Sequence, residues 1–519
     1  MAQRIGIVDM GSGTARLVVY QYEPGRWFKL TDEIREPVRL GEGFASSGAL
    51  DKNAIERALD ALKLYADYAA ATKLGRLEVI ATSAVREAAN SQDFLLRTAG
   101  LDLEFKVLSG ENEARYGALA VANSFVFPNC WVMDLGGGSA QLSKLENRWF
   151  ARGQAYLMGG VRLTEQFLKG DKASAKEVTA LEKHVKTHMG AQLERVRQEK
   201  APLVAMGGTI RNLARAVQKA SNYPLDMIHG YFLSRAALED VVEKLLKLEK
   251  GERSLPGIHP DRADVILAGA LVYRTVLREG NLEGVHISGQ GVREGAFYRH
   301  FLPEPHLIPE VRSFAVRNLF LQYPQPEAHT QNVRKLTRIL FEGLAPLHRY
   351  GSSEALLLDA AAYLHDIGMA VNYFDHHKHS AYLILNSQMP GLSHREHVML
   401  ALLTQYHRKG EPKLGEFKSV LEPDDDKRLL RLSACLRLAE YLERARAGRV
   451  TDLEIELGKD SVKIKLIAEE IPRVELWEAS KQAGLFEKAF DRKLELEAGE
   501  LHHRSLRSTP GGKTKRKND

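Results

Sequence analysis

Two short segments share one pattern, and this duplication constrains the fold more than any other feature of the sequence. Residues 8–14 read Val-Asp-Met-Gly-Ser-Gly-Thr, and residues 133–139 read Met-Asp-Leu-Gly-Gly-Gly-Ser. Each segment has an apolar strand, an Asp, a hydrophobic residue and a run of small residues, followed by a second strand-like stretch. Asp9 and Asp134 are separated by about the length of one α/β domain. The pattern predicts two related α/β domains, each opening with a β-hairpin.

The small residues of these turns are suited to binding an anion. Without bulky side chains, several backbone N–H groups can approach one anion together, and Ser or Thr hydroxyls add further donors. An Asp at a strand end can hold magnesium through water, so we expect Mg²⁺ (or Mn²⁺) at Asp9 and Asp134. The phosphate-binding residues predicted in the two turns are Gly11, Ser12, Gly13, Thr14, Gly136, Gly137, Gly138 and Ser139.

Two better-known phosphate motifs do not fit these turns. Neither turn ends in the Gly-Lys-Ser/Thr of a P-loop, and the first is followed by a strand-like run at residues 17–20 where a dinucleotide site requires a helix. Either turn alone can be explained as a β-hairpin whose glycines only close the turn. The presence of two matched turns favours a functional role in phosphate binding. A third turn adds Gly207, Gly208 and Thr209 to the predicted phosphate contacts, and a fourth spans residues 288–291.

The remainder of the first 300 residues alternates between strand-like and helix-like segments. Asp51 is expected to cap an amphipathic helix over residues 54–72. Strands are expected over residues 4–8, 17–22, 77–81, 104–108, 131–133 and 140–145. This alternation predicts an α/β architecture.

The character of the chain changes near Pro303 and Pro305. Residues 311–447 are helical by pattern and hold half of the 18 histidines, and residues 450–496 read as two strands, a helix and a strand. We predict five segments: two α/β domains over 1–122 and 123–303, a helical domain over 304–447, a small α/β domain over 448–500 and a basic flexible tail over 501–519.

Composition excludes several classes of protein. Charged residues at 27% and hydrophobic residues at 44% exclude a wholly disordered chain, and no apolar run approaches the roughly 20 residues of a spanning helix. Two cysteines, Cys130 and Cys435, exclude a disulfide framework, and the start leaves no room for a signal peptide, so we expect a cytoplasmic protein without a membrane partner. The net charge of +6 owes much to the tail, and without a nucleic-acid motif we expect no specific nucleic acid.

Five further segments carry a resemblance to a known family. They are Ala-Thr-Ser-Ala-Val-Arg-Glu-Ala at 81–88, Ser-Gly-Glu-Asn-Glu-Ala-Arg at 109–115, Leu-Pro-Gly-Ile at 255–258, Arg-Ala-Asp at 262–264 and Gly-Val-Arg-Glu-Gly at 291–295. With the glycine-rich turns, the chain resembles the superfamily of acetate kinase, sugar kinases, Hsp70 and actin. Within that superfamily it resembles the exopolyphosphatase/guanosine pentaphosphatase (Ppx/GppA) family.

The resemblance implies a fold and a partner state. The fold is α/β, with duplicated ribonuclease H-like (actin/Hsp70-type) domains followed by an all-α HD-like domain and a small α/β C-terminal domain. A homodimer is implied by the family. The sequence departs from the family pattern at Gly13, where Asn is usual, and at Asn112, where Glu is frequent.

The resemblance also implies an activity, the hydrolysis of the terminal phosphoanhydride of linear inorganic polyphosphate. It marks Glu113 as the catalytic base that orients and deprotonates water, and Arg86 suits a bidentate phosphate contact. Neither cysteine falls in a motif, so direct attack by water is the simpler mechanism. From the residues alone, both Arg86 and Glu113 are equally explained as solvated helix residues.

Three alternatives to the exopolyphosphatase remain open. A guanosine pentaphosphate 5′-phosphohydrolase shares these motifs. A non-catalytic sensor of polyphosphate or guanosine tetraphosphate is the alternative from another class, and the presence of Glu113 argues against it. A kinase is disfavoured, since nothing in the sequence specifically indicates an adenosine pocket.

The histidine-rich segment resembles the HD phosphohydrolase pattern His…His-Asp…Asp. His329, His365 and Asp366 match it, and Glu440 stands where Asp is expected, one methylene longer. We predict that these four residues bind a second divalent metal. Purely polar packing remains the alternative for each histidine. Further candidate ligands or phosphate contacts are His376, His377, His379, His397 and His407.

Overall fold

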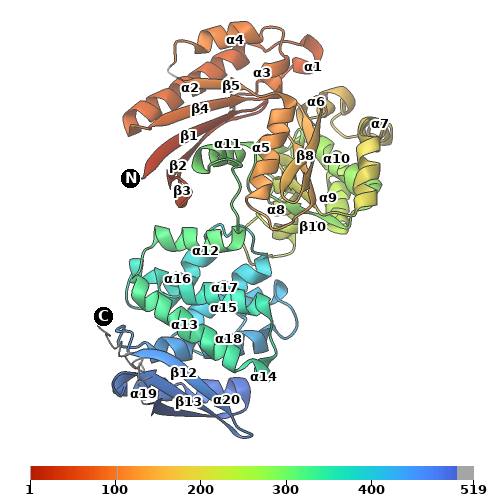
Figure 1. Cartoon of the computed structure of the whole chain (residues 1–519). Helices are drawn as coiled ribbons and strands as arrows, with labels where there is room; N and C mark the ends of the chain where they lie inside the picture. The colour runs from red at the N-terminus through yellow and green to blue at the C-terminus, as the bar shows by residue number, and fades with distance from the viewer. Residues whose placement is uncertain (1, 102, 500–519) are drawn as a thin grey trace, which may run out of the picture. The chain divides into compact units, whose positions relative to one another are not determined.

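A computed structural model describes residues 2–101 and 103–499 (Figure 1). The chain forms two compact units. The first comprises Met1–Pro324, Ala381–Ala401 and Gly415–Glu422, and the second comprises Gln325–Ser380, Leu402–Leu414 and Pro423–Asp519. The predicted basic tail over 501–519 lies outside the described residues.

The first unit begins with a five-stranded sheet in the order β3-β2-β1-β4-β5. The hairpin strands β1, β2 and β3 pair antiparallel, while β4 and β5 continue the sheet from β1 in parallel. The elements are β1 (Gln3–Met10), β2 (Ala15–Glu23), β3 (Trp27–Glu36), α1 (Phe44–Ser47), α2 (Lys52–Thr72), β4 (Arg76–Ala81), α3 (Ser83–Glu87), α4 (Ser91–Thr98), β5 (Glu104–Val107) and α5 (Gly110–Ala122).

A second sheet repeats this topology and adds one edge strand. Its order is β10-β11-β9-β6-β7-β8, with an antiparallel β6-β7-β8 meander and β9 parallel to β6. The elements are β6 (Cys130–Leu135), β7 (Ala140–Glu146), β8 (Trp149–Tyr156), α6 (Gly160–Phe167), α7 (Ala175–Glu199), β9 (Leu203–Met206), α8 (Gly208–Ala220), β10 (Phe232–Ser234), α9 (Arg235–Lys247), α10 (Ile266–Glu279), β11 (Gly284–Ile287) and α11 (Val292–Phe301).

Both faces of the first sheet are buried, because β1 carries apolar side chains on each of its two faces. Val8 and Met10 belong to the core that includes the inner side of α2. Ile5 and Ile7 face the opposite way and pack with Phe297 of α11. The helix that covers this second face therefore comes from the end of the second sheet's sequence.

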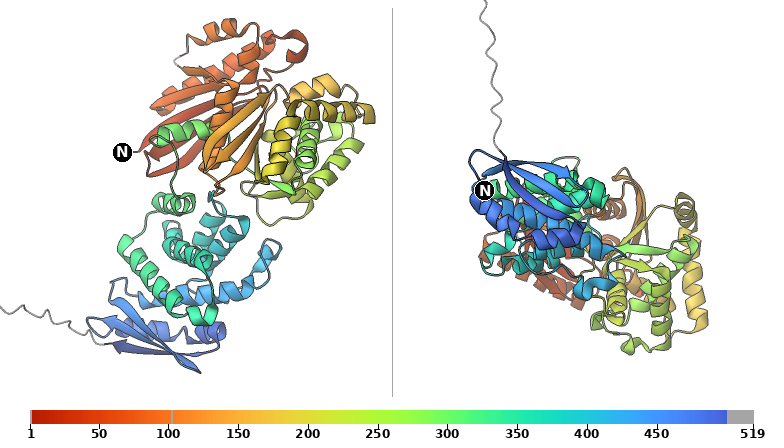
Figure 2. Two further views of the ribbon diagram at one scale, coloured as in Figure 1. Left: turned by 45° about the vertical axis from the view of Figure 1, so that its right-hand side comes forward. Right: turned by 90° about the horizontal axis from the view of Figure 1, so that it is seen from below.

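In the same way, one face of the second sheet is covered by α5, a helix of the first repeat. Trp131 and Met133 of β6 face the core made with α7, α8 and α10, whereas Val132 packs with Val121 of α5. The two views show α5 lying between the two sheets (Figures 1 and 2). A Cβ on Gly295 of α11 would lie 2.0 Å from a backbone oxygen of α5, so these exchanged helices cross in close contact.

The remaining helices and the last sheet follow in chain order. In the small sheet, β13 pairs antiparallel with β12 and parallel with β14. The elements are α12 (Val311–Gln322), α13 (Glu327–Gly343), α14 (Ala345–His348), α15 (Ser352–Leu364), α16 (His376–Leu385), α17 (His394–Tyr406), α18 (Asp425–Leu442), β12 (Val450–Leu457), β13 (Ser461–Ala468), α19 (Arg473–Ser480), α20 (Ala483–Phe490) and β14 (Lys493–Gly499).

The predicted fold class is confirmed: two repeated α/β domains precede a helical region and a small α/β end. The strand segments predicted in the first 145 residues are all present, and Asp51 caps α2 by accepting hydrogen bonds from two backbone N–H groups. Five strands were not predicted, namely β3, β8, β9, β10 and β11. The last segment has two short helices instead of one. Within the described ranges, no helix has both the length and the apolar content needed to cross a membrane.

Candidate functional site

The two glycine-rich turns adopt the same backbone arrangement. The N–H of Gly11 donates to the carbonyl of Thr14 (3.1 Å), and the N–H of Gly136 donates to that of Ser139 (2.9 Å). In each case the Asp is the penultimate residue of the strand before the turn. The duplication seen in the sequence is therefore also a duplication of geometry.

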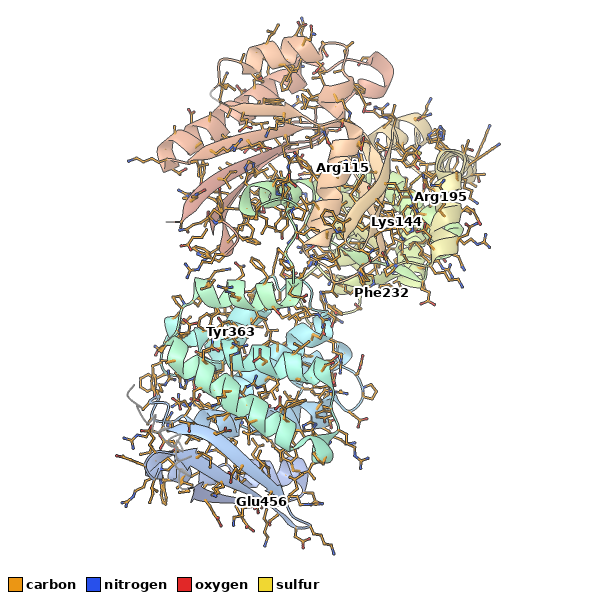
Figure 3. All side chains as sticks on the ribbon, viewed as in Figure 1. Arg115, Lys144, Arg195, Phe232, Tyr363 and Glu456 are labelled. Carbon is orange, nitrogen blue, oxygen red and sulfur yellow. The ribbon has the colours of Figure 1, made fainter. Side chains whose placement is uncertain are left out.

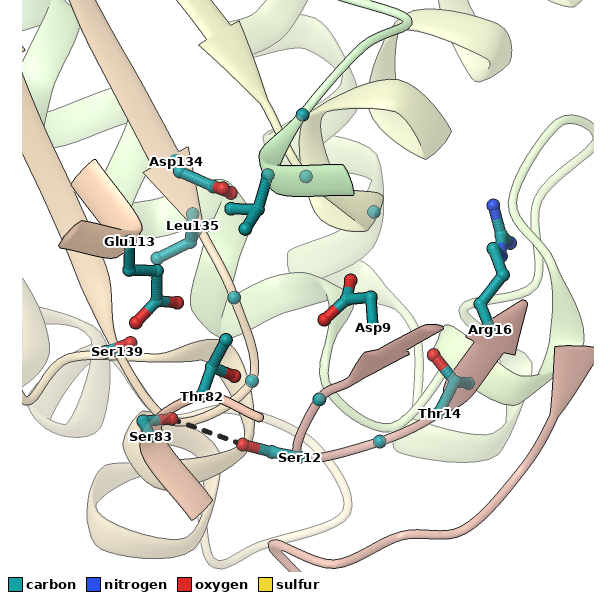
Figure 4. Close-up of a pocket in the computed structure, with 18 of the residues that line it drawn as sticks. Asp9, Ser12, Thr14, Arg16, Thr82, Ser83, Glu113, Asp134, Leu135 and Ser139 are labelled. Carbon is teal, nitrogen blue, oxygen red and sulfur yellow. Dashed lines mark hydrogen bonds between the residues drawn. The ribbon is translucent and has the colours of Figure 1, made fainter. Parts of the chain in front are cut away.

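The two turns border one pocket of about 170 Å³. Figure 4 shows the carboxylates of Asp9, Glu113 and Asp134 directed into the same space from three elements. Predicted site residues that line the pocket are Asp9, Gly11, Ser12, Gly13, Thr14, Glu113, Asp134, Gly136, Gly137, Ser139, Gly207 and Gly208. Gly138 lines a smaller neighbouring cavity, whereas Thr209 and Arg86 are not among the lining residues.

Four arginines that were not predicted as site residues also line the pocket. They come from β2, from α8, from the turn before α10 and from the first turn of α11. These residues are Arg16, Arg211, Arg262 and Arg293. The last two lie inside the segments that carried the family resemblance, which is the signal that could have identified them. Four guanidinium groups beside three carboxylates make a site for an anion and a cation together.

The fourth small-residue turn holds one of these arginines in place. Arg211 Nε donates to the carbonyl of Ser288 (2.9 Å), and Arg211 Nη2 donates to the carbonyl of Gln290 (3.2 Å). Burial lowers the pKa of Arg211, and the neighbouring Arg293 lowers it further. A phosphate oxygen would relieve this like-charge repulsion.

The third turn places the start of α8 at the pocket. Gly207 has φ +98°, and a Cβ there would lie 2.6 Å from the carbonyl oxygen of Leu135 and 3.0 Å from Asp134 Oδ1. Only glycine fits this position without strain. The helix has no side-chain cap, so its first N–H groups and its positive dipole end are available to an anion.

Glu113 is buried on the first turn of α5, which Ser109 caps by accepting from the N–H of Asn112 (3.2 Å). Arg86 Nη1 donates to Glu113 Oε2 (3.0 Å) and to the carbonyl of Leu108 (2.7 Å). The structure thus places Arg86 against the predicted base. Arg115, two residues on, is half exposed and pairs with Glu111 on the helix surface (Figure 3).

The environment of the pocket favours the neutral forms of its carboxyl groups. Burial raises the pKa of Glu113 to about 7; Arg86 opposes this rise, and the nearby charge of Asp134 adds to it. Burial likewise raises the pKa of Asp134 to about 6 and raises that of Asp9, against the opposing effect of Arg293. A carboxyl group that titrates near 7 can exchange a proton with water at neutral pH.

The residues present fit a magnesium ion. Within the described part of the chain, neither Asp9 nor Asp134 forms an ion pair, although both side chains are partly buried. A divalent cation would offset the free-energy cost of burying these charges. Carboxylate oxygens, with hydroxyls and water nearby, are the ligands that Mg²⁺ prefers.

The four residues predicted to bind a second metal also come together, in the second unit. Glu440 Oε2 lies 3.2 Å from His365 Nε2 and 3.4 Å from His329 Nε2. Asp366 Oδ2 lies 3.6 Å from each of these two imidazole nitrogens.

The fold and the pocket together define a protein with two repeated α/β domains of actin-like fold and a pocket, lined by arginines and glycines, between the repeated hairpin turns. Residues 18–304 match the Ppx/GppA phosphatase family, and residues 311–475 match Ppx/GppA phosphatase, domain III. The chain belongs to the Ppx/GppA phosphatase family. It is accordingly a hydrolase of phosphoanhydride bonds.

Two curated relatives extend over most of the chain. A guanosine-5′-triphosphate,3′-diphosphate pyrophosphatase of Pseudoalteromonas translucida is 26% identical over 452 residues, which is 84% of each chain. A protein of the same name from Vibrio vulnificus is 25% identical over 466 residues, 88% of this chain and 90% of its own length. Among solved structures, an exopolyphosphatase of Cytophaga hutchinsonii superposes with a TM-score of 0.55 at 22% identity, covering 58% of this chain and 98% of its own.

Proposed function

We propose that this chain is a magnesium-dependent exopolyphosphatase that releases orthophosphate from the end of linear inorganic polyphosphate. The observation that carries the proposal is the lining of the pocket. Of the described residues that border it, none is aromatic, whereas four are arginines and seven are glycines. Such a surface recognises phosphoryl oxygens and offers no stacking partner to a nucleobase.

Glu113 is the group placed to activate water. Its carboxylate, directed into the pocket, would accept a proton from a water molecule aligned with the terminal phosphorus. Arg86 fixes the orientation of this carboxylate through the 3.0 Å hydrogen bond and lowers its pKa. The guanidinium groups and turn N–H groups would stabilise the charge that develops on the phosphoryl oxygens. A magnesium ion held by Asp9 and Asp134 would neutralise further negative charge.

A second cavity offers a path for the rest of a long substrate. Its volume is about 640 Å³. The lining residues that it shares with the pocket are Ser12, Gly13, Thr14, Val161 and Arg262. Its basic residues are Arg35, Arg39, Arg57, Lys250 and Arg262, and its acidic residues are Glu42, Glu165, Asp261 and Asp264. A polyanion longer than the pocket would enter this cavity and meet the arginines.

Guanosine pentaphosphate is the second candidate substrate, because the two curated relatives carry the corresponding name. The larger cavity has room for a nucleoside. Of its described lining residues none is aromatic, so a guanine base would bind there without stacking.

A two-substrate comparison tests the proposal. Orthophosphate release from long-chain polyphosphate and from guanosine pentaphosphate would be measured on the full chain, with magnesium and after chelation. We expect the larger kcat/KM on polyphosphate and no turnover without a divalent cation. Cleavage of the nucleotide alone would replace the first candidate with the second, and binding of both without phosphate release would support the sensor.

A further inference from the structure

A chain of charged side chains joins Glu113 to the second glycine-rich turn, and the proposed function uses only its first link. Arg86 Nη1 donates to Glu113 Oε2, as described above, and Arg86 Nη2 donates to Glu87 Oε1 (3.4 Å). The other oxygen of Glu87 accepts from Arg162 Nη2 (2.7 Å), and Arg162 Nε donates to the carbonyl of Gly138 (3.2 Å). Negative and positive charges therefore alternate from the base to the turn.

This chain of side chains crosses from one repeated domain to the other. Arg86 and Glu87 are the last two residues of α3, which follows β4 of the first sheet. Arg162 lies in the first turn of α6, which follows β8 of the second sheet. The two repeats are in contact beside it, because a Cβ on Gly138 of the second turn would clash with the hydroxyl of Ser83 in α3. All of these residues belong to the first unit.

The helix that carries Arg162 begins directly on the second turn. The N–H of Gly160 donates to the carbonyl of Gly136 (2.9 Å), and the N–H of Val161 donates to that of Gly137 (2.9 Å). The N–H of Arg162 itself also donates to the carbonyl of Gly137 (3.3 Å). The first N–H groups of a helix have no partner within the helix, and here the turn supplies their acceptors. A displacement of the turn would therefore be transmitted to Arg162.

The side chains of this chain are largely shielded from water. The exposed fractions are 10% for Glu113, 21% for Arg86 and 20% for both Glu87 and Arg162. Ion pairs at such positions interact more strongly than pairs on the open surface, because less water screens their charges. Removal of one member leaves the charges of its partners without compensation. The links are therefore strong enough to hold side chains in fixed positions.

Glu87 lies between two guanidinium groups that would otherwise repel each other. Each of its carboxylate oxygens accepts from a different arginine, so one carboxylate holds both Arg86 and Arg162. An uncharged Gln at this position would direct its NH₂ group at one of the two guanidinium groups, and donor would face donor. Arg86 would keep its contacts with Glu113 and the carbonyl of Leu108 but lose its link to the second repeat.

Glu87 and Arg162 are placed to act through other residues. Neither is among the described residues that line the phosphate pocket. Arg162 borders the smaller neighbouring cavity together with Gly138. A contribution of either side chain to hydrolysis would therefore reach the substrate through Arg86 and Glu113 or through the turn.

We propose that Glu87 and Arg162 are positioning residues that couple the orientation of Glu113 to the second glycine-rich turn. A phosphate group bound by the N–H groups of this turn fixes α6 and Arg162. Arg162 then fixes Glu87, and Glu87 holds Arg86 against the base. The base is aligned for attack when the substrate engages both repeats. The inference rests on the proposed function, because it requires Glu113 to activate water, but it applies to polyphosphate and to guanosine pentaphosphate alike.

Steady-state kinetics on the full chain separate positioning from binding. With magnesium and whichever of the two substrates is cleaved faster, Glu87→Gln and Arg162→Gln should each lower kcat by about tenfold and leave KM unchanged. Glu199→Gln is the matched control, because this carboxylate also bridges two cations, Lys144 and Arg152, and does not line the pocket. The control should retain its kcat. Wild-type kcat in both test variants, a raised KM at unchanged kcat, or an equal loss in the control would overturn the proposal.

A double-mutant cycle tests whether Glu87 acts through Arg86. Arg86→Gln alone should lower kcat by about tenfold near pH 7, and Glu87→Gln should cause no further loss in that background. Independent contributions would multiply to a loss of about a hundredfold, and this result would refute the coupling. Arg162→Gln in the Glu87→Gln background applies the same test to the next link.

Two further comparisons make each outcome decisive. Where Glu87→Gln fails to fold, Arg162→Gln combined with Arg86→Gln provides the same cycle from the other end of the chain of side chains. Glu113→Gln distinguishes this inference from the proposed function. Full activity in Glu113→Gln would remove the base and the inference together. A large loss in Glu113→Gln, with full activity in Glu87→Gln and Arg162→Gln, would overturn the inference alone.

Discussion

Buried carboxyl groups gather at two places in the molecule, and their partners differ. In the pocket of the first unit, burial raises the pKa values of Glu113 and Asp134 and no imidazole lies among the described lining residues. In the second unit, burial also raises the pKa of Asp366, but neighbouring imidazoles and Arg446 outweigh it and hold the pKa well below its usual range. Oxygen-rich surroundings suit Mg²⁺, whereas imidazole-rich surroundings suit transition metals. The comparison therefore predicts different metals and different chemistry at the two places.

Removal of the proposed base, Glu113, should have the largest effect on activity, and it should affect only the pocket of the first unit. Glu113→Gln keeps the size of the side chain but cannot accept a proton, so we expect kcat for phosphate release to fall by about 10³-fold. Steady-state kinetics on the preferred substrate would measure this loss. Glu111→Gln, on the exposed side of the same helix turn, should retain activity. Full activity in the Glu113 variant would disprove the assigned chemistry.

Exchange of the bound metal should distinguish the pocket of the first unit from the histidine-rich cluster of the second unit. After chelation, Mg²⁺ should restore phosphate release, whereas Mn²⁺ or Zn²⁺ should also raise the unfolding midpoint of the second unit. At a hundredfold excess over the dissociation constant, the added stability would be about 2.7 kcal/mol. Calorimetry on the full chain would follow both units. Equal stabilisation of the second unit by Mg²⁺ would remove the distinction between the sites.

A glycine of the pocket should be costly to replace. Gly207→Ala forces a Cβ into a position with φ +98° and 2.6 Å from the carbonyl of Leu135, so we expect a loss of about 1–3 kcal/mol and lower activity. Gly190→Ala in the middle of α7 meets nothing within 4 Å and should stabilise the chain by about 0.5–1 kcal/mol. Thermal unfolding of both variants measures the contrast. Equal unfolding midpoints would show that Gly207 is not required by its backbone conformation.

The smallest expected effect is a change in pH dependence. A base must be deprotonated, so activity should fall as the pH drops through about 7, the pKa of Glu113. Arg86 lowers that pKa, and its removal in Arg86→Gln should move the acidic limb of the kcat/KM profile to higher pH. We expect a loss of about tenfold near pH 7 that becomes smaller in alkaline solution. A uniform loss at all pH values would instead indicate that Arg86 contacts the substrate.

The sequence pattern was sufficient to predict the two strands of each hairpin. It was insufficient to predict the third strand that pairs with the outer side of each hairpin. Leu17 and Val19 on β2 alternate with residues of the opposite face in an apolar run, so the strand is visible in the pattern. The third strand, β3, reads Trp-Phe-Lys-Leu-Thr-Asp-Glu-Ile-Arg-Glu and is mostly exposed or half-buried. An edge strand of this kind is specified by pairing with its neighbour, which a local pattern does not record.

The site residues that lie within the short turn motifs could be predicted from the sequence. The site residues that only the tertiary fold brings to the pocket could not. The turns carry Asp, glycine and hydroxyl residues in sequence order, so Asp9 and Ser139 were found. Arg16 and Arg211 converge on the same pocket from strands and helices far apart in the chain, and nothing in their immediate sequence distinguishes them from the other basic residues. Arg86 was expected to contact phosphate, but its position beside Glu113 depends on the packing of α3 against the start of α5.

The exchange of covering helices affects how the chain folds as it is made. The first sheet is complete in sequence by β5, yet the helix that covers its second face, α11, is synthesised only at Val292–Phe301. At ribosomal rates of about 5–20 residues per second, the apolar face with Ile5 and Ile7 would lack this helix for on the order of ten seconds. A nascent chain in that state is a natural client for a chaperone.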